Sequence, residues 1–202
     1  MRVRLVYVST FLLACETYMR WQYNVAAASI GVLLLVLGAC SLIPTNWIGA
    51  TRDSSGRPTV VKIGELAPEI NLQSMTGDLI VLSQFVGHPV LVNFWARWCD
   101  PCRAEFPTLV RKYKQYQDQG FVIIGVNTGD DNPDEGLLVF MRNTLVTFPI
   151  VRDRDGRIAR MYNIKGLPTS VFIDRTGIAR DIFVGGPMED EFIDQKFAQI
   201  NK

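Results

Sequence analysis

The chain has 202 residues, of which 48% are hydrophobic and 20% are charged, so it can bury one substantial core with some length to spare. Its 21 basic and 20 acidic side chains leave a net charge of +1. This balance lacks the basic excess with which proteins bind nucleic-acid phosphates, so we expect neither a DNA nor an RNA partner.

An apolar segment near the N-terminus is expected to leave water. No charged residue stands between Arg20 and Arg52, and residues 25–43, VAAASIGVLLLVLGACSLI, are almost wholly apolar. At ~1.5 Å per residue, a helix of this length could just cross the roughly 30 Å apolar core of a bilayer as a transmembrane anchor. The same run fits the hydrophobic region of a signal peptide, behind a leader of residues 1–24 whose true start we expect at Met19.

Two interpretations of this segment stay open. Residues 37–40, LGAC, resemble the lipobox of bacterial lipoproteins, in which Cys40 would carry the lipid and become the mature N-terminus. In the alternative, the helix is uncleaved and Cys40 is only a small apolar residue. In both, the remaining chain lies outside the cytoplasm. Residues 44–62, rich in turn-forming and small polar residues, are expected to form a linker to a domain at 63–202.

The predicted domain begins with alternating strands and helices. Apolar stretches on either side of the turn MTGD, within residues 70–82, favour a short β-hairpin. Residues 89–95, PVLVNFW, are apolar on both faces, as a central buried strand is. Residues 100–116 have apolar side chains at helical spacing, and FVIIGV at 121–126 is a second buried strand. Strand, helix and strand at this spacing predict a parallel βαβ unit.

The C-terminal half continues the alternation. An inserted stretch, residues 128–148, is expected to hold a helix at 135–143. Further elements are expected at FPIV (148–151), a helical DGRIARMYN (155–163), TSVFID (169–174), IARDIFV (178–184) and a terminal helix at 189–200. A short turn joins the last two strands, which must therefore be antiparallel. We expect an α/β fold with a central mixed sheet flanked by helices.

The predicted domain has two cysteines, Cys99 and Cys102, in FWARWCDPCRAEFP at residues 94–107. A zinc site would need further ligands, and His88, the only histidine of the chain, fits a surface turn. We therefore expect no metal, and no cofactor is indicated. A purely structural bridge is a weak interpretation, because closing so short a loop removes little entropy from the unfolded chain.

Thiol chemistry explains the cysteine pair better. Cys99 directly follows a buried strand and opens a helix, where unpaired backbone N–H groups and the helix dipole stabilise a thiolate. Pro101 suits the first helical turn. We predict that Cys99 is the accessible nucleophile and that Cys102, one turn further in, resolves the mixed disulfide. Trp98 is expected to contribute to an apolar collar around the pair.

At this point the sequence resembles a known group of proteins. FWARWCDPC resembles the active-site segment of the thioredoxin fold. WCDPCRAEFP, with the hairpin, insertion and linker, is similar to the membrane-anchored thiol-disulfide oxidoreductases of the TlpA and ResA kind. The resemblance covers about residues 63–200. It implies a thioredoxin-like fold in which Pro168 is cis and faces the cysteine pair, while the backbone of Leu167 binds substrate in extended form.

One departure from thioredoxin concerns the proton. Asn93 stands where thioredoxin carries a buried aspartate, so another group must accept the proton of the resolving thiol. Glu105 follows Cys102 by three residues on the same helix face, and the ResA resemblance implies a glutamate there, near the active site. The alternative is a solvated helix carboxylate. Asp130, after the second strand, is another acidic candidate.

The resemblance implies a reductase that receives electrons from a membrane thiol donor and passes them to protein disulfides outside the cytoplasm, often in cytochrome c maturation. Thr169 stands where the cytochrome-specific relatives carry glutamate, which leaves the substrate open. A peroxiredoxin-like thiol peroxidase is one alternative, although Ala96 stands where a peroxidatic cysteine needs a hydroxyl three residues before it. The other is an anchored, non-catalytic binding module that uses the groove around Pro168.

Overall fold

A computed structural model of the chain describes residues 52–53 and 56–202. The predicted leader, the apolar run at 25–43 and Cys40 lie outside the described residues. Within the described ranges, none of the helices combines the length and apolar character needed to span a bilayer.

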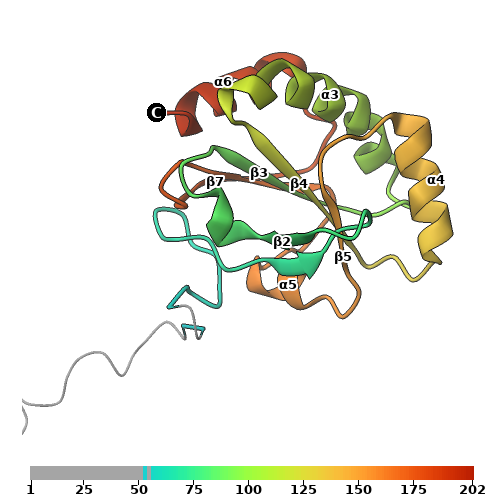
Figure 1. Cartoon of the computed structure of the whole chain (residues 1–202), viewed down its shortest axis with the longest axis horizontal. Helices are drawn as coiled ribbons and strands as arrows, with labels where there is room; N and C mark the ends of the chain where they lie inside the picture. The colour runs from blue at the N-terminus through green and yellow to red at the C-terminus, as the bar shows by residue number, and fades with distance from the viewer. Residues whose placement is uncertain (1–51, 54–55) are drawn as a thin grey trace, which may run out of the picture. The chain divides into compact units, whose positions relative to one another are not determined.

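A five-stranded mixed sheet in the order β5-β4-β3-β6-β7 forms the centre of the domain (Figure 1). Its strands are β3 (Val90–Trp95), β4 (Val122–Thr128), β5 (Ile150–Asp153), β6 (Thr169–Ile173) and β7 (Ala179–Val184). β3, β4 and β5 are parallel, while β6 is antiparallel to β3 and β7 is antiparallel to β6. All residues of β3 are buried, which explains why its sequence is apolar on both faces.

A separate two-stranded hairpin precedes the sheet. It consists of β1 (Asn71–Gln73) and β2 (Leu79–Val81), which pair antiparallel across the predicted turn. The predicted thioredoxin-like arrangement is thereby confirmed, with its mixed sheet, its N-terminal hairpin and its helical insertion.

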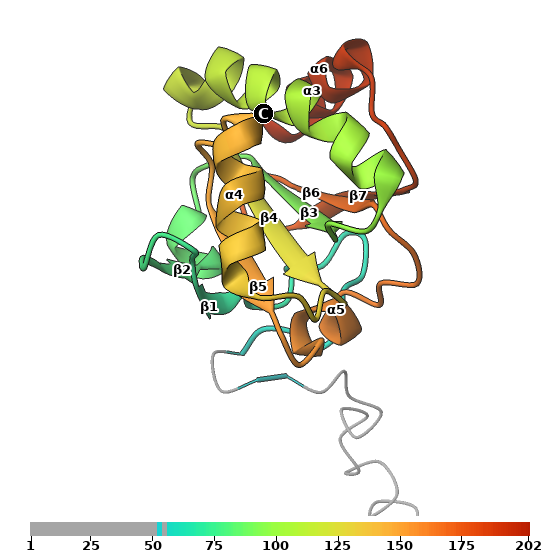
Figure 2. The ribbon, with the colours of Figure 1, turned by 90° about the vertical axis from the view of Figure 1, so that its right-hand side faces the viewer.

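Helices cover both faces of the sheet. They are α3 (Asp100–Tyr116), α4 (Asp134–Thr144), α5 (Arg157–Met161) and α6 (Asp190–Ile200). Figure 1 shows α3 and α6 above the sheet and α5 with the hairpin below it, and Figure 2 shows the same layers after a quarter turn. The inserted helix α4 packs on the α3 side, since its buried Leu137 belongs to the same core cluster as Phe106 of α3.

The alternation of side chains along β3 divides the core in two. Leu91 and Trp95 belong to the cluster under α3, whereas Val92 and Phe94 belong to the cluster shared with α5 and the hairpin. Asn93 lies between Leu91 and Trp95 in this alternation and is fully buried. Because successive side chains of a strand point to opposite faces, the Asn93 side chain points toward α3, like those of Leu91 and Trp95.

The end of the predicted linker contacts the domain. The backbone N–H of Val61 donates to the carbonyl of Met161 at 2.8 Å. Arg57 is buried; its guanidinium donates to the carbonyl of Ala67 at 2.8 Å and its Nε lies 3.3 Å from Oε2 of Glu69. Packing onto the domain thus begins before the boundary expected at Ile63.

Candidate active site

The cysteine pair lies at the N-terminus of α3. Cys99 and Cys102 form a disulfide, with their Cα atoms 5.3 Å apart. Cys99 is the N-cap of α3, and its Sγ accepts a hydrogen bond from the backbone N–H of Cys102 at 3.3 Å. Cys99 keeps 5% of its surface exposed and Cys102 keeps none, so Cys99 is the more accessible of the two. After reduction, the same N–H and the helix dipole favour a thiolate at Cys99.

The Leu167–Pro168 segment lies beside the end of β3. Its peptide bond is cis, as predicted. β6 starts directly after Pro168, and the register pairs Thr169 with Phe94. Because the two strands are antiparallel, this register brings Pro168 alongside the end of β3, from which the cysteine segment leaves. Leu167 is half-buried and packs against both core clusters.

Glu105 is buried between α3 and the sheet, with only 1% of its surface exposed. Its Oε1 accepts a hydrogen bond of 2.7 Å from Nδ2 of Asn93, which also donates to Oγ of Ser170 at 3.1 Å. Its Oε2 has no hydrogen-bond partner among the described residues. Glu105 is therefore not a solvated helix carboxylate.

The surroundings of Glu105 set its acidity. Burial raises its pKa from the ordinary 4.5 to about 7, because a charged carboxylate loses its hydration there. The Asn93 amide opposes this rise. The backbone N–H of Met188 also lowers the pKa, although it makes no hydrogen bond of ordinary geometry with the carboxyl group. A carboxyl group with a pKa near 7 can exchange its proton under physiological conditions.

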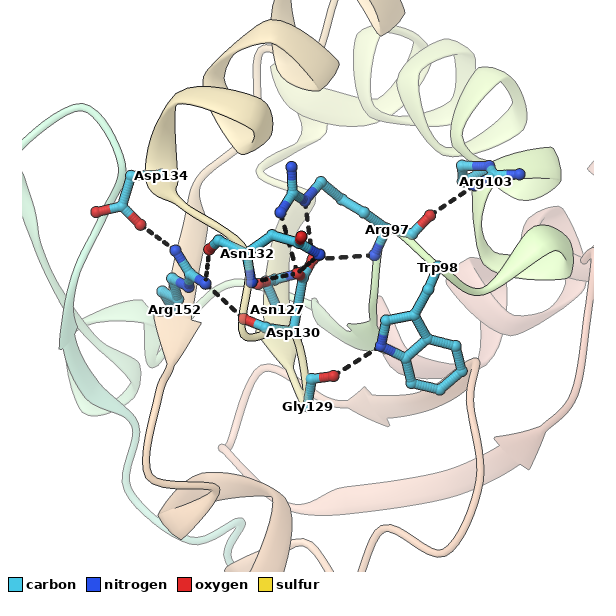
Figure 3. Close-up of polar contacts among 9 residues, drawn as sticks. All are labelled: Arg97, Trp98, Arg103, Asn127, Gly129, Asp130, Asn132, Asp134 and Arg152. Carbon is cyan, nitrogen blue, oxygen red and sulfur yellow. Dashed lines mark hydrogen bonds and ion pairs between the residues drawn. The ribbon is translucent and has the colours of Figure 1, made fainter.

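Asp130, the other acidic candidate, has a different environment (Figure 3). Its Oδ2 lies 2.9 Å from Nε of Arg97 and its Oδ1 lies 3.1 Å from Nη2 of the same side chain. Burial opposes ionisation of Asp130, but hydrogen bonds from Arg97, Asn132 and Asn127 outweigh it and hold its pKa well below the usual range. Asp130 therefore remains ionised near neutral pH and fixes the loop before the cysteines.

Trp98 joins this loop to the end of β4. Trp98 is 60% exposed, yet its indole N–H donates to the carbonyl of Gly129 at 2.7 Å (Figure 3). On the other side, Nη1 of Arg103 donates to the carbonyl of Arg97 at 2.7 Å. Trp98, the residue before Cys99, thus presents an exposed aromatic ring whose indole N–H is anchored to the loop after β4.

The inserted helix α4 belongs to the same network. Arg152 of β5 pairs with Asp134, the first residue of α4, and donates to the backbone carbonyls of Asp130 and Asn132 (Figure 3). The insertion is thus tied through Asp130 to the loop that carries Arg97 and Trp98.

Several contributors to the site were not predicted from the sequence. Ser170 accepts a hydrogen bond from the Asn93 amide, the backbone of Met188 lowers the pKa of Glu105, and Arg97 pairs with Asp130. In the sequence, only the polar Asn93 in an otherwise apolar strand pointed toward such an arrangement. A second cis peptide, Gly186–Pro187, follows β7.

Metal ligands do not gather in this part of the molecule. In residues 52–53 and 56–202, no three His, Cys, Asp or Glu side chains lie where they could hold a metal ion. His88 is exposed, and its Nδ1 lies 3.1 Å from the carbonyl oxygen of Gly120.

A cysteine pair that forms a disulfide at a helix N-terminus, beside a cis-proline loop in a thioredoxin-like sheet, defines a thiol-disulfide oxidoreductase. Comparison with known proteins agrees with this class. The AhpC/TSA family matches residues 63–182, which is more than half of the chain, and the chain belongs to that family.

Its curated relatives include several proteins named thiol-disulfide oxidoreductase ResA. The chain is 32% identical to ResA of Bacillus subtilis over 155 residues, which cover 77% of this chain and 82% of the relative. It is 36% identical to ResA of Geobacillus thermodenitrificans over 182 residues, which cover 90% and 99%. These matches show a ResA-like thiol-disulfide oxidoreductase, and a peroxidase is not favoured.

Solved structures lead to the same class. A crystal structure of a proposed thiol:disulfide interchange protein DsbE from Chlorobium tepidum superimposes with a TM-score of 0.64 at 32% identity. The match covers 70% of this chain and 99% of that one.

Proposed function

We propose that the protein reduces protein disulfides outside the cytoplasm, with Cys99 as the nucleophile, Cys102 as the resolving thiol and Glu105 as the acceptor of the Cys102 proton. The proposal rests on one observation above all. A disulfide-forming pair at the start of α3 is followed, one helical turn later, by a carboxyl group that is buried and hydrogen-bonded to Asn93.

In the first step, the Cys99 thiolate of the reduced protein attacks one sulfur of the substrate disulfide. The substrate S–S bond breaks, a mixed disulfide with Cys99 forms, and the other substrate sulfur leaves as a thiolate that takes a proton from water. The N-cap position of Cys99, with the Cys102 N–H directed at its sulfur, favours the attacking thiolate.

In the second step, the Cys102 thiol gives its proton to the Glu105 carboxylate and attacks Sγ of Cys99. The mixed disulfide breaks, the second substrate sulfur leaves as a thiolate and takes a proton, and the protein ends as the Cys99–Cys102 disulfide. Two electrons have passed to the substrate. The raised pKa of Glu105 suits this transfer, because a group with a pKa near ambient pH can both accept and release a proton.

The charges around Cys99 favour a reducing role over an oxidising one. Asp100 pairs with Arg103, and both side chains are largely exposed, so their opposite effects on a nearby thiolate are small and nearly cancel. A strong thiol oxidant needs a much more stabilised thiolate. Electrons must then return to the disulfide, and we propose that a membrane thiol protein supplies them.

Substrate binding is assigned to the surface around Cys99. An extended segment of the substrate would pair with the backbone of Leu167, next to Pro168, and lie against the exposed ring of Trp98. Protein disulfides in extended segments fit this surface. Apocytochrome c is one such substrate that the resemblance implies.

Anchoring to a membrane is part of the proposal and rests on the apolar run at 25–43. The intact mass of the membrane-extracted protein tests both forms of the anchor. A mass that begins at Cys40 and includes lipid supports the lipoprotein, and a mass that retains residues upstream of Cys40 supports the uncleaved helix.

Trapping with Cys102→Ser tests the catalytic proposal. Without the resolving thiol, Cys99 should hold its natural target as a stable mixed disulfide, which mass spectrometry identifies, and Cys99→Ser should hold none. The purified chain should also equilibrate its cysteine pair with glutathione buffers. A Cys99→Ser variant that still promotes reduction of a model protein disulfide would refute catalysis by the pair and favour a binding module.

A further inference from the structure

The segment between β7 and α6 approaches the site at Gly186. A Cβ atom placed on Gly186 would lie 2.8 Å from Cγ of Pro168 and 2.9 Å from Oε2 of Glu105. Both distances are shorter than side-chain carbons tolerate. The backbone of this one residue therefore touches the substrate-binding proline and the buried carboxyl together, and only glycine leaves room for both.

The segment is held at both of its ends. Before it, Val184 of β7 pairs with Thr169 of β6, and the backbone N–H of Gly185 donates to the carbonyl of Pro168 at 2.8 Å. After it, Met188 is buried and Asp190, the first residue of α6, pairs with Arg111 of α3, Nη2 to Oδ1, at 2.6 Å. The approach of Gly186 is thus built into the fold.

We infer that Gly186 is a positioning residue, whose missing side chain lets one backbone segment cover the Glu105 carboxyl and the Pro168 ring at once. The inference rests on the proposed function, because it concerns the proton acceptor and the substrate loop named there. This contact would fix the distance between Pro168, beside which the substrate binds, and Glu105, which accepts the proton.

The cover over Glu105 also keeps water from Oε2, which has no hydrogen-bond partner among the described residues. The other groups that face this carboxyl are the Asn93 amide from β3 and the backbone of Met188, while Cys102 precedes it by one turn on its own helix. Across the described part of the chain, no charged side chain contributes to its pKa shift. If the segment lifts, hydration should stabilise the carboxylate and lower that pKa.

The chain offers a closely matched control in Gly166. Apart from its chain neighbours, no described residue would come nearer to a Cβ atom there than Cγ1 of Val184, at 4.0 Å. Neither Gly166 nor Gly186 is among the glycines with positive φ, so Ala is free of left-handed strain at both. Gly186→Ala and Gly166→Ala therefore add the same methyl group near the same loop, and they differ in what that group touches.

The test uses the full-length chain, purified in detergent, with a model protein disulfide as substrate and ¹³C NMR of glutamate carboxyl carbons as a second readout. For Gly186→Ala we expect kcat/KM to fall about tenfold, because a small displacement of reacting groups is costly. We also expect the Glu105 titration midpoint to move below its value of about 7. Gly166→Ala should stay within about twofold of the unchanged chain, with the same midpoint.

Two outcomes separate the inference from the proposed function. If Gly186→Ala matches Gly166→Ala in both readouts, Gly186 has no positioning role, whatever Glu105 does. If instead the pH profile of turnover is unchanged in Glu105→Gln, Glu105 is not the proton acceptor, and the proposed mechanism fails independently of Gly186.

If Gly186→Ala folds poorly, a double variant still tests the contact between Gly186 and Glu105. Combining Gly186→Ala with Glu105→Ala removes one of the two groups that the new methyl would strike. The contact is supported if Gly186→Ala lowers the Tm less in the Glu105→Ala background than it does in the unchanged protein. An equal defect in both backgrounds overturns it.

Discussion

Glu105 and Asn93 meet in a hydrogen bond of 2.7 Å between Oε1 and Nδ2, with both side chains buried. The amide comes from the middle of the central strand and the carboxyl from the helix that carries the cysteines. An amide can donate to a carboxyl group but cannot accept its proton at neutral pH. The titrating group of this pair is therefore Glu105.

The stability of the oxidised protein should depend on pH through Glu105. Its folded pKa of about 7 lies above the ordinary value of 4.5, so the folded state binds this proton more tightly than the unfolded chain does. The resulting stability is complete below pH 4.5 and is lost as the pH rises through about 7. Relative to Glu105→Gln, the unchanged protein should lose up to about 3 kcal/mol between pH 4.5 and 8.

Denaturant unfolding of the unchanged protein and of Glu105→Gln, both oxidised, measures this difference in stability across the same pH range. Glu135→Gln is the control, because Glu135 is an exposed carboxyl on α4. A Glu105→Gln curve that runs parallel to that of the unchanged protein would contradict the raised pKa.

Exchanging the carboxyl group of Glu105 and the amide of Asn93 should preserve function better than placing a carboxyl group at both positions. Asn93→Asp alone places two buried carboxyl groups together, which raises the pKa of the pair and destabilises the fold near neutral pH by about 2 kcal/mol or more. Asn93→Asp with Glu105→Gln restores one acid and one amide. We expect the double variant to recover stability and part of the turnover, measured by unfolding and by disulfide reduction. Additive losses in the double variant would show that the two residues do not act as a pair.

Removing the charge of Asp130 should loosen the loop before the cysteines. Asp130→Asn leaves the Arg97 guanidinium, which is largely buried, without its ionised partner, and should destabilise the protein by about 2 kcal/mol. Thermal unfolding measures this loss. Asp131→Asn, the exposed neighbour, is the control and should change stability by less than about 0.5 kcal/mol. Equal effects of the two substitutions would mean that the Arg97 pair contributes nothing specific.

Trp98 should act on substrate binding more than on folding, because the residue is 60% exposed. Trp98→Ala is expected to raise the KM for a protein disulfide about tenfold. Trp98→Phe keeps an aromatic face and loses only the hydrogen bond to Gly129, so its KM should rise less. Steady-state kinetics with both variants decides, and an unchanged KM in Trp98→Ala would remove Trp98 from the binding surface.

Local sequence patterns were enough to predict the order of the elements and the redox-active cysteine pair between β3 and α3. The apolar run of β3, the helical spacing after Cys99 and the paired cysteines depend on local patterns of burial and on residue type, and the structure has each where it was predicted. The cis peptide before Pro168 followed from the resemblance. Lipidation at Cys40 and an anchor at residues 25–43 stay predictions, since these residues lie outside the described ranges.

Which polar side chains lie together could be seen only in the folded chain. Helical periodicity puts Glu105 on the same face of α3 as Cys102. Its surroundings, however, come from Asn93 of strand β3 and from the segment at Gly186, far along the chain. Asp130, equally acidic in sequence, is instead held ionised by Arg97. The pKa of a carboxyl group depends on hydration and on nearby donors, which long-range packing brings together, and so local sequence alone could not distinguish the two.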